Sequence, residues 1–169
     1  MQSKFDQIHK IIKNIDTELN SIKHDSKKLE LLNKHFEFIK LFPHQGVQSI
    51  TGLMYVKDSK GNKEKVVFKV SSNFDNILKL EKIILERLQT TRKCCPNVMG
   101  YLGILNIPLA KKYLENPKEN NIFDFDEEMY LKQVAFYEYI TINENGNGNG
   151  SGGDKQKEIS MSMYNIDKN

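Results

Sequence analysis

The chain has 169 residues, with 25 basic and 22 acidic side chains and a formal net charge of +3 at pH 7. Charges of both signs are spread along it without a block of like charge, so nothing favours a nucleic-acid or membrane partner. The length allows one domain with a hydrophobic core plus tails and excludes two large domains.

The first forty residues predict two helices. Apolar residues recur at steps of three and four from Phe5 to Ile22, which predicts an amphipathic helix packed on the domain. A coiled coil is the alternative, although few heptads are present. A second helical stripe follows and runs until Pro43. Its members are Leu29, Leu32, Phe36 and Ile39. We therefore assign residues 1–42 to an N-terminal helical extension.

The next segment predicts a β-hairpin and a long helix. GLMYVKD and KEKVVFKV have strand composition, and the SKGN between them is a turn sequence. SSNFDNILKLEKIILERLQ begins with Ser72 and Asp75 in the spacing of a capping box and continues as a periodic helix. Its predicted buried stripe contains one carboxylate among three apolar residues. These are Ile77, Glu81, Ile84 and Leu88.

Two further strands and a polar tail complete the chain. The strands are predicted at about 98–105 and in YLKQVAFYEYITI. We expect an α+β domain over residues 43–142, an antiparallel sheet with one long helix across it and two helices before it. Residues 143–158 are rich in Gly and Asn, which predicts a disordered loop, and residues 159–169 form a C-terminal tail.

Lys69 stands in the middle of an apolar strand and Glu81 on the apolar stripe of the helix that follows. Burying either charge alone costs several kcal/mol, whereas a lysine on a sheet and a glutamate on the covering helix neutralise each other. We therefore expect Lys69 and Glu81 to pair. The alternative is that Lys69 extends to the sheet edge and Glu81 lies at the border of the stripe.

The remaining reactive side chains predict no metal site. The four histidines are scattered without ligand spacing, and the only cysteines, Cys94 and Cys95, are adjacent. Adjacent cysteines give no disulfide framework, so a reducing compartment is expected. The N-terminus does not have the pattern of a signal peptide, and no apolar stretch has the length of a membrane helix. A cytoplasmic location is therefore predicted, with a nuclear one lacking an obvious targeting signal as the alternative.

Four segments resemble, in order, parts of the N-terminal lobe of protein kinases. VVFK at 66–69 resembles the VAIK strand, and LEKIILERL at 80–88 is similar to the helix whose glutamate holds the VAIK lysine. CPNVMGYLGI at 95–104 resembles the HPNIV segment with its strand, and VAFYEYI at 134–140 resembles the strand that enters the hinge. The resemblance covers residues 46–140, and the sequence of these segments is similar to that of divergent serine/threonine kinases of large DNA viruses.

The resemblance implies a set of ATP-binding residues. Lys69 would bind the α- and β-phosphates of ATP, and Glu81 would hold Lys69. Gly46, Ser49 and Gly52 would belong to the loop that covers the phosphates. At the hinge, the backbone of residues 138–140 would face the adenine, with Tyr137 at the back of the pocket. Glu138 and Ile140 are the hinge residues that we assign to ATP.

The sequence also departs from the kinase pattern. Of the three glycines in the GxGxxG loop only Gly52 is in place, because Val47 and Ser49 stand where the first two belong. No HRD or DFG motif follows Ile140, and the DFD at 124–126 precedes the hinge strand, where a solvated acidic turn is expected. The aspartates that accept the substrate proton and hold Mg²⁺ are therefore missing from this chain, which we expect not to be a competent kinase alone.

Two functions are consistent with these patterns. The first is the ATP-binding lobe of a serine/threonine protein kinase, with ATP and a protein substrate as partners and Mg²⁺ bound only if a longer polypeptide supplies the missing lobe. Such an enzyme would act in the cytoplasm, or in the host cytoplasm if it is viral. The alternative is a kinase-like or unrelated α+β module that binds a protein partner without catalysis.

Overall fold

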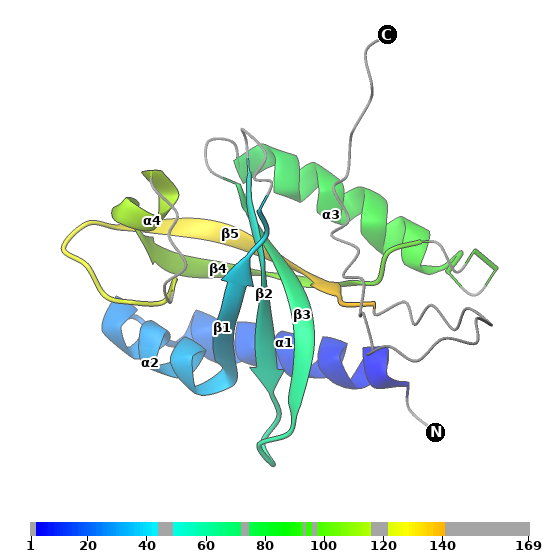
Figure 1. Cartoon of the computed structure of the whole chain (residues 1–169), viewed down its shortest axis with the longest axis horizontal. Helices are drawn as coiled ribbons and strands as arrows, with labels where there is room; N and C mark the ends of the chain where they lie inside the picture. The colour runs from blue at the N-terminus through cyan, green and yellow to red at the C-terminus, as the bar shows by residue number, and fades with distance from the viewer. Residues whose placement is uncertain are drawn as a thin grey trace, which may run out of the picture. The chain divides into compact units, whose positions relative to one another are not determined.

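One antiparallel sheet organises the part of the chain that the computed structural model describes, which comprises residues 3–43, 49–71, 75–92, 94–95, 98–115 and 122–140. Its five strands lie in the order β1-β2-β3-β5-β4 (Figure 1). They are β1 (Phe36–Leu41), β2 (Ser49–Lys57), β3 (Lys63–Ser71), β4 (Tyr101–Ala110) and β5 (Met129–Glu138). The helices are α1 (Lys4–Ser21), α2 (Asp25–His35), α3 (Asp75–Gln89) and α4 (Lys111–Glu115). The predicted α+β fold, with two helices before the sheet and a long helix packed on it, is confirmed.

The two faces of the sheet carry separate cores, because successive side chains of a strand point to opposite faces. Val66, Phe68 and Val70 of β3 belong to the larger core, which includes the buried residues of α1 and α2. On the other face Val67 packs on a smaller core with α3. Figure 1 shows α1 and α2 on one side of the strands and α3 on the other. The face under α3 is therefore the one that holds Lys69, two residues after Val67.

Helix α1 packs on the domain as predicted. It begins with a capping box, in which the Ser3 hydroxyl accepts the backbone N–H of Asp6 at 3.1 Å and the Asp6 carboxylate accepts the backbone N–H of Ser3. Its buried residues, Ile8, Ile12, Ile15 and Leu19, all belong to the predicted stripe, whose end members Phe5 and Ile22 are partly buried. The helix contacts β4 in particular, so it stabilises the far edge of the sheet.

The prediction that the second helix continues to Pro43 is wrong. Helix α2 ends at His35, and Phe36 begins strand β1, which pairs with β2. Phe36 is buried and its ring stacks on that of Phe136 with centroids 5.0 Å apart, while Phe38 lies against Phe68. Aromatic residues two positions apart suit a strand. The stretch assigned to a helical extension, residues 1–42, therefore includes the first strand of the sheet.

The predicted hairpin is confirmed. Strands β2 and β3 pair in continuous register from Ser49 with Ser71 to Lys57 with Lys63. The Asp58 carboxylate accepts backbone N–H groups from Lys60 and Asn62 at 2.8 Å each, and Gly61 has a φ of 84°. That φ is in the left-handed region, which glycine adopts at little cost, so this turn fixes the register of the hairpin.

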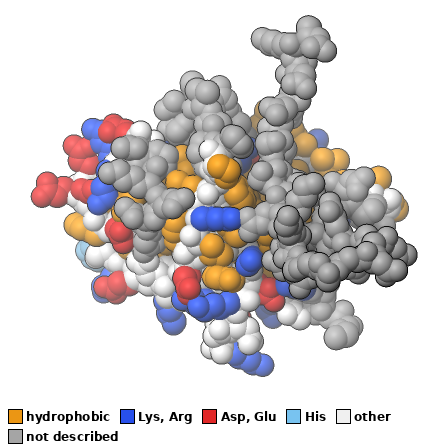
Figure 2. All heavy atoms as spheres, in the orientation of Figure 1, with side chains coloured by type: hydrophobic (Ala, Val, Ile, Leu, Met, Phe, Trp, Pro, Cys, Tyr) orange, Lys and Arg blue, Asp and Glu red, His pale blue; other side chains and the backbone are white. Residues whose placement is uncertain are grey.

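The two strands predicted after α3 are also present, as β4 and β5. The short helix α4 between these two strands was not predicted from the sequence. The proposed cap at Ser72, the Gly/Asn-rich loop at 143–158 and the tail at 159–169 lie outside the described residues. No described helix is long and apolar enough to cross a membrane. On the face in view in Figure 2, basic and acidic side chains are intermixed.

Candidate functional site

An ion pair joins the sheet to α3. Lys69 lies in the middle of β3, opposite Thr51 of β2 and Ala135 of β5. Its Nζ donates a hydrogen bond to Oε2 of Glu81 on α3 at 2.7 Å. The predicted pairing of Lys69 with Glu81 is therefore confirmed, and the alternative in which the lysine extends away to the sheet edge is wrong.

The pair is largely withdrawn from water. The Lys69 side chain is 21% exposed and the Glu81 side chain 16%. Apolar neighbours surround it on the sheet face, among them Val67, Ala135 and Ile104. In such surroundings each charge depends on the other, because an unpaired ion loses its hydration without compensation. The Lys69 side chain is nevertheless not completely shielded from solvent.

Tyr137 completes this cluster from β5. Its ring is buried at 2% exposure, and its hydroxyl lies 3.0 Å from Oε1 of Glu81. A carboxylate only accepts, so the tyrosine donates. Burial and the neighbouring Glu81 raise the pKa of the Tyr137 hydroxyl, which keeps the proton on it. Both oxygens of Glu81 are thus occupied, one by Lys69 and the other by Tyr137.

The buried face of α3 differs from the predicted one. Leu78 and Leu85 are buried against the sheet, whereas Ile84 and Leu88 are 50% and 40% exposed. Glu81 still points inward, because positions 78, 81 and 85 follow one another at steps of three and four. The predicted stripe of Ile84 and Leu88 with Glu81 is wrong. The apolar positions of this helix spread over more than half of its circumference, so the pattern alone did not define one narrow face.

Two of the three residues assigned to the phosphate-covering loop, Ser49 and Gly52, lie in β2. Ser49 is the first residue of the strand and pairs with Ser71. Gly52 lies inside the strand between Phe68 and Leu41. A Cβ on Gly52 would be 2.6 Å from both the Lys40 carbonyl oxygen and the Phe68 ring, so close packing requires glycine here. Gly46 lies outside the described residues.

The end of β5 holds the residues assigned to the hinge. The backbone N–H of Glu138 donates to the Gly100 carbonyl oxygen at 2.7 Å. Its carboxylate forms an ion pair with Arg92, which follows α3 in the chain, and the Arg92 guanidinium lies 4.5 Å over the ring of Phe5. The sequence carried no signal for these contacts. Ile140, two residues beyond the strand, is 41% exposed.

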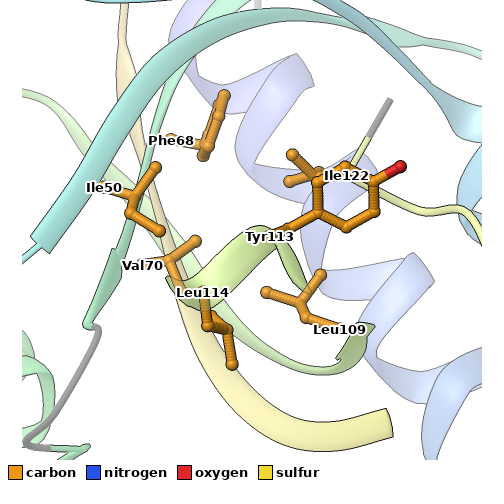
Figure 3. A pocket seen from close by; sticks show the side chains of 7 residues that line it. All are labelled: Ile50, Phe68, Val70, Leu109, Tyr113, Leu114 and Ile122. Atoms are coloured by element: carbon orange, nitrogen blue, oxygen red, sulfur yellow. The ribbon is translucent and has the colours of Figure 1, made fainter. Parts of the chain in front are cut away.

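Two hollows lie away from the ion pair. Figure 3 shows one on the other face of the sheet, lined by seven apolar or aromatic side chains that include Ile50, Phe68 and Val70. Its volume of about 10 Å³ has room for roughly one water and none for a nucleotide. A second hollow of about 420 Å³ lies between α1 and the β2–β3 hairpin. Lys4 and Lys63 on its wall pair with Glu64 and Glu37, so it offers no concentrated positive charge.

The described residues contain no cluster of side chains that could bind a metal ion. No three His, Cys, Asp or Glu side chains there lie close enough together to hold a metal ion. Cys94 and Cys95 are free thiols at exposed positions. Two partly buried ion pairs have been described, Lys69 with Glu81 and Arg92 with Glu138, and the first also has a tyrosine hydroxyl as a partner.

Comparison with protein-family models, with curated proteins and with solved structures gives no match. The case for a function therefore rests on the residues of the site.

Proposed function

We propose that this chain is an ATP-binding lobe of the protein-kinase type, which holds ATP for phosphoryl transfer to a serine or threonine hydroxyl of a protein. The single observation that carries the proposal is the 2.7 Å contact of Lys69 with Glu81 between β3 and α3. A lysine that grips nucleotide phosphates, oriented by a glutamate from the next helix, is the arrangement this chemistry uses.

Features around Lys69 support the proposal. The ammonium has three donors and gives one of them to Glu81, and its side chain remains partly exposed. Glu81 holds the flexible lysine chain in one direction, which lowers the entropy lost when phosphates bind. Val67 lies two residues earlier on the same face and is partly buried, an apolar surface of the kind that lines nucleotide pockets.

Phosphate binding by the loop before β2 is a lesser part of the proposal. Gly52 is fixed inside a strand by its contacts with Lys40 and Phe68. We therefore assign the phosphates chiefly to Lys69, with Ser49 at the start of β2 as a further donor. Phosphoryl transfer also needs carboxylates for Mg²⁺ and for the substrate proton, which a longer polypeptide or a partner would supply.

A thermal-shift titration tests this function. ATP with Mg²⁺ should raise the unfolding temperature of the full 169-residue chain, since a ligand at ~100 times its Kd adds ~2.7 kcal/mol of stability. Lys69→Met should abolish the shift and leave the fold intact. Lys65→Met is the matched control, because Lys65 lies four residues earlier on the same strand and face.

The Lys65→Met control should keep the full shift in unfolding temperature, since it removes one lysine charge and leaves the pair of Lys69 and Glu81 in place. No shift in the unmodified chain at millimolar ATP, or equal shifts in all three proteins, would contradict the proposal.

One observation favours the alternative, a protein-interaction module. Four large apolar side chains of helix α3 are 40% to 61% exposed. They are Leu80, Ile83, Ile84 and Leu88. Exposed apolar residues gathered on one helix mark a binding surface more often than chance. A chain that binds no ATP but loses a protein partner on Ile84→Lys would fit this alternative.

A further inference from the structure

The hydroxyl of Tyr137 is placed where it can control the ion pair. Tyr137 lies on β5 opposite Val67 of β3 and Tyr101 of β4, with its ring buried under α3. Its only side-chain polar atom donates to Oε1 of Glu81 at 3.0 Å. The raised pKa of this hydroxyl, caused by burial and by Glu81, keeps it a donor across the physiological pH range.

The carboxylate of Glu81 is held from two directions. Lys69 occupies Oε2 from β3 and Tyr137 occupies Oε1 from β5. Turning the carboxylate about its own axis would break one or both contacts, so the two donors fix its rotation. Lys69 alone would leave that rotation open, and the long side chains of both ions would then have more freedom.

We propose that Tyr137 is a positioning residue, whose hydroxyl holds Glu81 so that Lys69 is already aimed at the nucleotide site before ATP binds. The inference rests on the proposed function. A preformed pair binds phosphates without the entropy cost of ordering two flexible side chains at that moment. This role is additional to any contact between the ring of Tyr137 and the nucleotide.

Tyr101 provides a matched control in the same core. It lies directly across from Tyr137 on β4, their rings meet edge to face with centroids 5.9 Å apart, and it is 3% exposed. Its hydroxyl is buried and has no hydrogen-bond partner among the described residues. Tyr101→Phe therefore removes a buried hydroxyl that makes no hydrogen bond with the described residues. The effect of this substitution on stability should be neutral or slightly favourable.

Calorimetric titration of the full chain with ATP and Mg²⁺ tests the proposal. Tyr137→Phe keeps the ring and removes one hydrogen bond to a charged group, so affinity should fall about tenfold. Tyr101→Phe should bind as the unmodified chain does. With Glu81→Met, which has similar length and no acceptor oxygen, adding Tyr137→Phe should cause no further loss of affinity.

The outcomes separate the two proposals. Unchanged affinity in Tyr137→Phe, even with a lower unfolding temperature, would show a purely structural tyrosine and overturn the inference alone. A further loss of affinity on adding Tyr137→Phe to Glu81→Met would also overturn it, because the effect would then bypass Glu81. Absence of ATP binding by the unmodified chain would overturn the proposed function and this inference with it.

Discussion

Glu81→Gln isolates the charge of the central pair. Glutamine has nearly the size of glutamate and can still accept the hydroxyl of Tyr137, so the change removes the attraction to Lys69 and little else. Lys69 would remain, 21% exposed, without a counter-charge. The fold should therefore lose stability in the nucleotide-free protein.

The size of the expected loss of stability follows from how deeply the ion pair is buried. An exposed ion pair contributes ~0–1 kcal/mol, whereas breaking a fully buried pair costs ~3–5 kcal/mol. With its side chains 21% and 16% exposed, the pair of Lys69 and Glu81 lies between these limits, and we expect a loss of ~2 kcal/mol on the same scale. On the same helix, Lys82 and Glu86 are 3.9 Å apart with side chains 42% and 53% exposed. Glu86→Gln should cost no more than ~0.5 kcal/mol.

Urea unfolding at pH 7 followed by circular dichroism measures both losses. The midpoint should move clearly for Glu81→Gln and hardly for Glu86→Gln, with equal slopes if both variants keep the native compactness. Equal losses in the two variants would refute the reasoning, because they would show that the inward pair is solvated like the outward one.

Two further predictions concern stability. Gly52→Ala should lower the free energy of unfolding by ~1–3 kcal/mol, since the new Cβ would lie 2.6 Å from the Lys40 carbonyl oxygen and the buried Phe68 ring. Gly61→Asn at the hairpin turn should change the stability little, because asparagine tolerates the left-handed backbone conformation. Denaturant midpoints measure both effects. Lys63 and Lys57 lower the pKa of Glu37 from 4.5 to about 2. Its contribution is therefore complete above about pH 4.5 and is lost as the pH falls toward about 2. Stability measured against pH should fall less steeply over this window in Glu37→Gln, and an unchanged profile would contradict the assignment.

The sheet could be predicted from sequence where local signals agreed. Strands β2 and β3 have aromatic and β-branched residues on either side of a turn with glycine, and both strands were predicted from this pattern. Strand β1 was missed because Phe36 and Ile39 continue the three- and four-residue spacing of α2. Pairing with β2 and the stacking of Phe36 on Phe136, a hundred residues away, favour the strand. Pairing with a distant partner overrode the local pattern here.

The candidate site was predicted in part. A lysine inside an apolar strand and a glutamate on the following helix required partners, and this burial cost, together with the resemblance to kinases, led us to expect Lys69 to pair with Glu81. The bond from Tyr137 to Glu81 was not predicted, because it depends on β5 lying beside β3, which the sequence order does not reveal. Gly52 was assigned to a loop, although a glycine flanked on both sides by strand residues signals a close approach inside a strand.

In the proposed function Lys69 faces the phosphates of a bound nucleotide. An ATP analogue with an acyl group on its terminal phosphate tests this directly, since a lysine amine beside the phosphates takes the acyl group as an amide and releases the nucleotide. Mass spectrometry then locates the label along the chain. We expect Lys69 to be acylated before the exposed lysines, and we expect excess ATP to protect it. Labelling confined to exposed lysines, or labelling of Lys69 that ATP does not reduce, would contradict it.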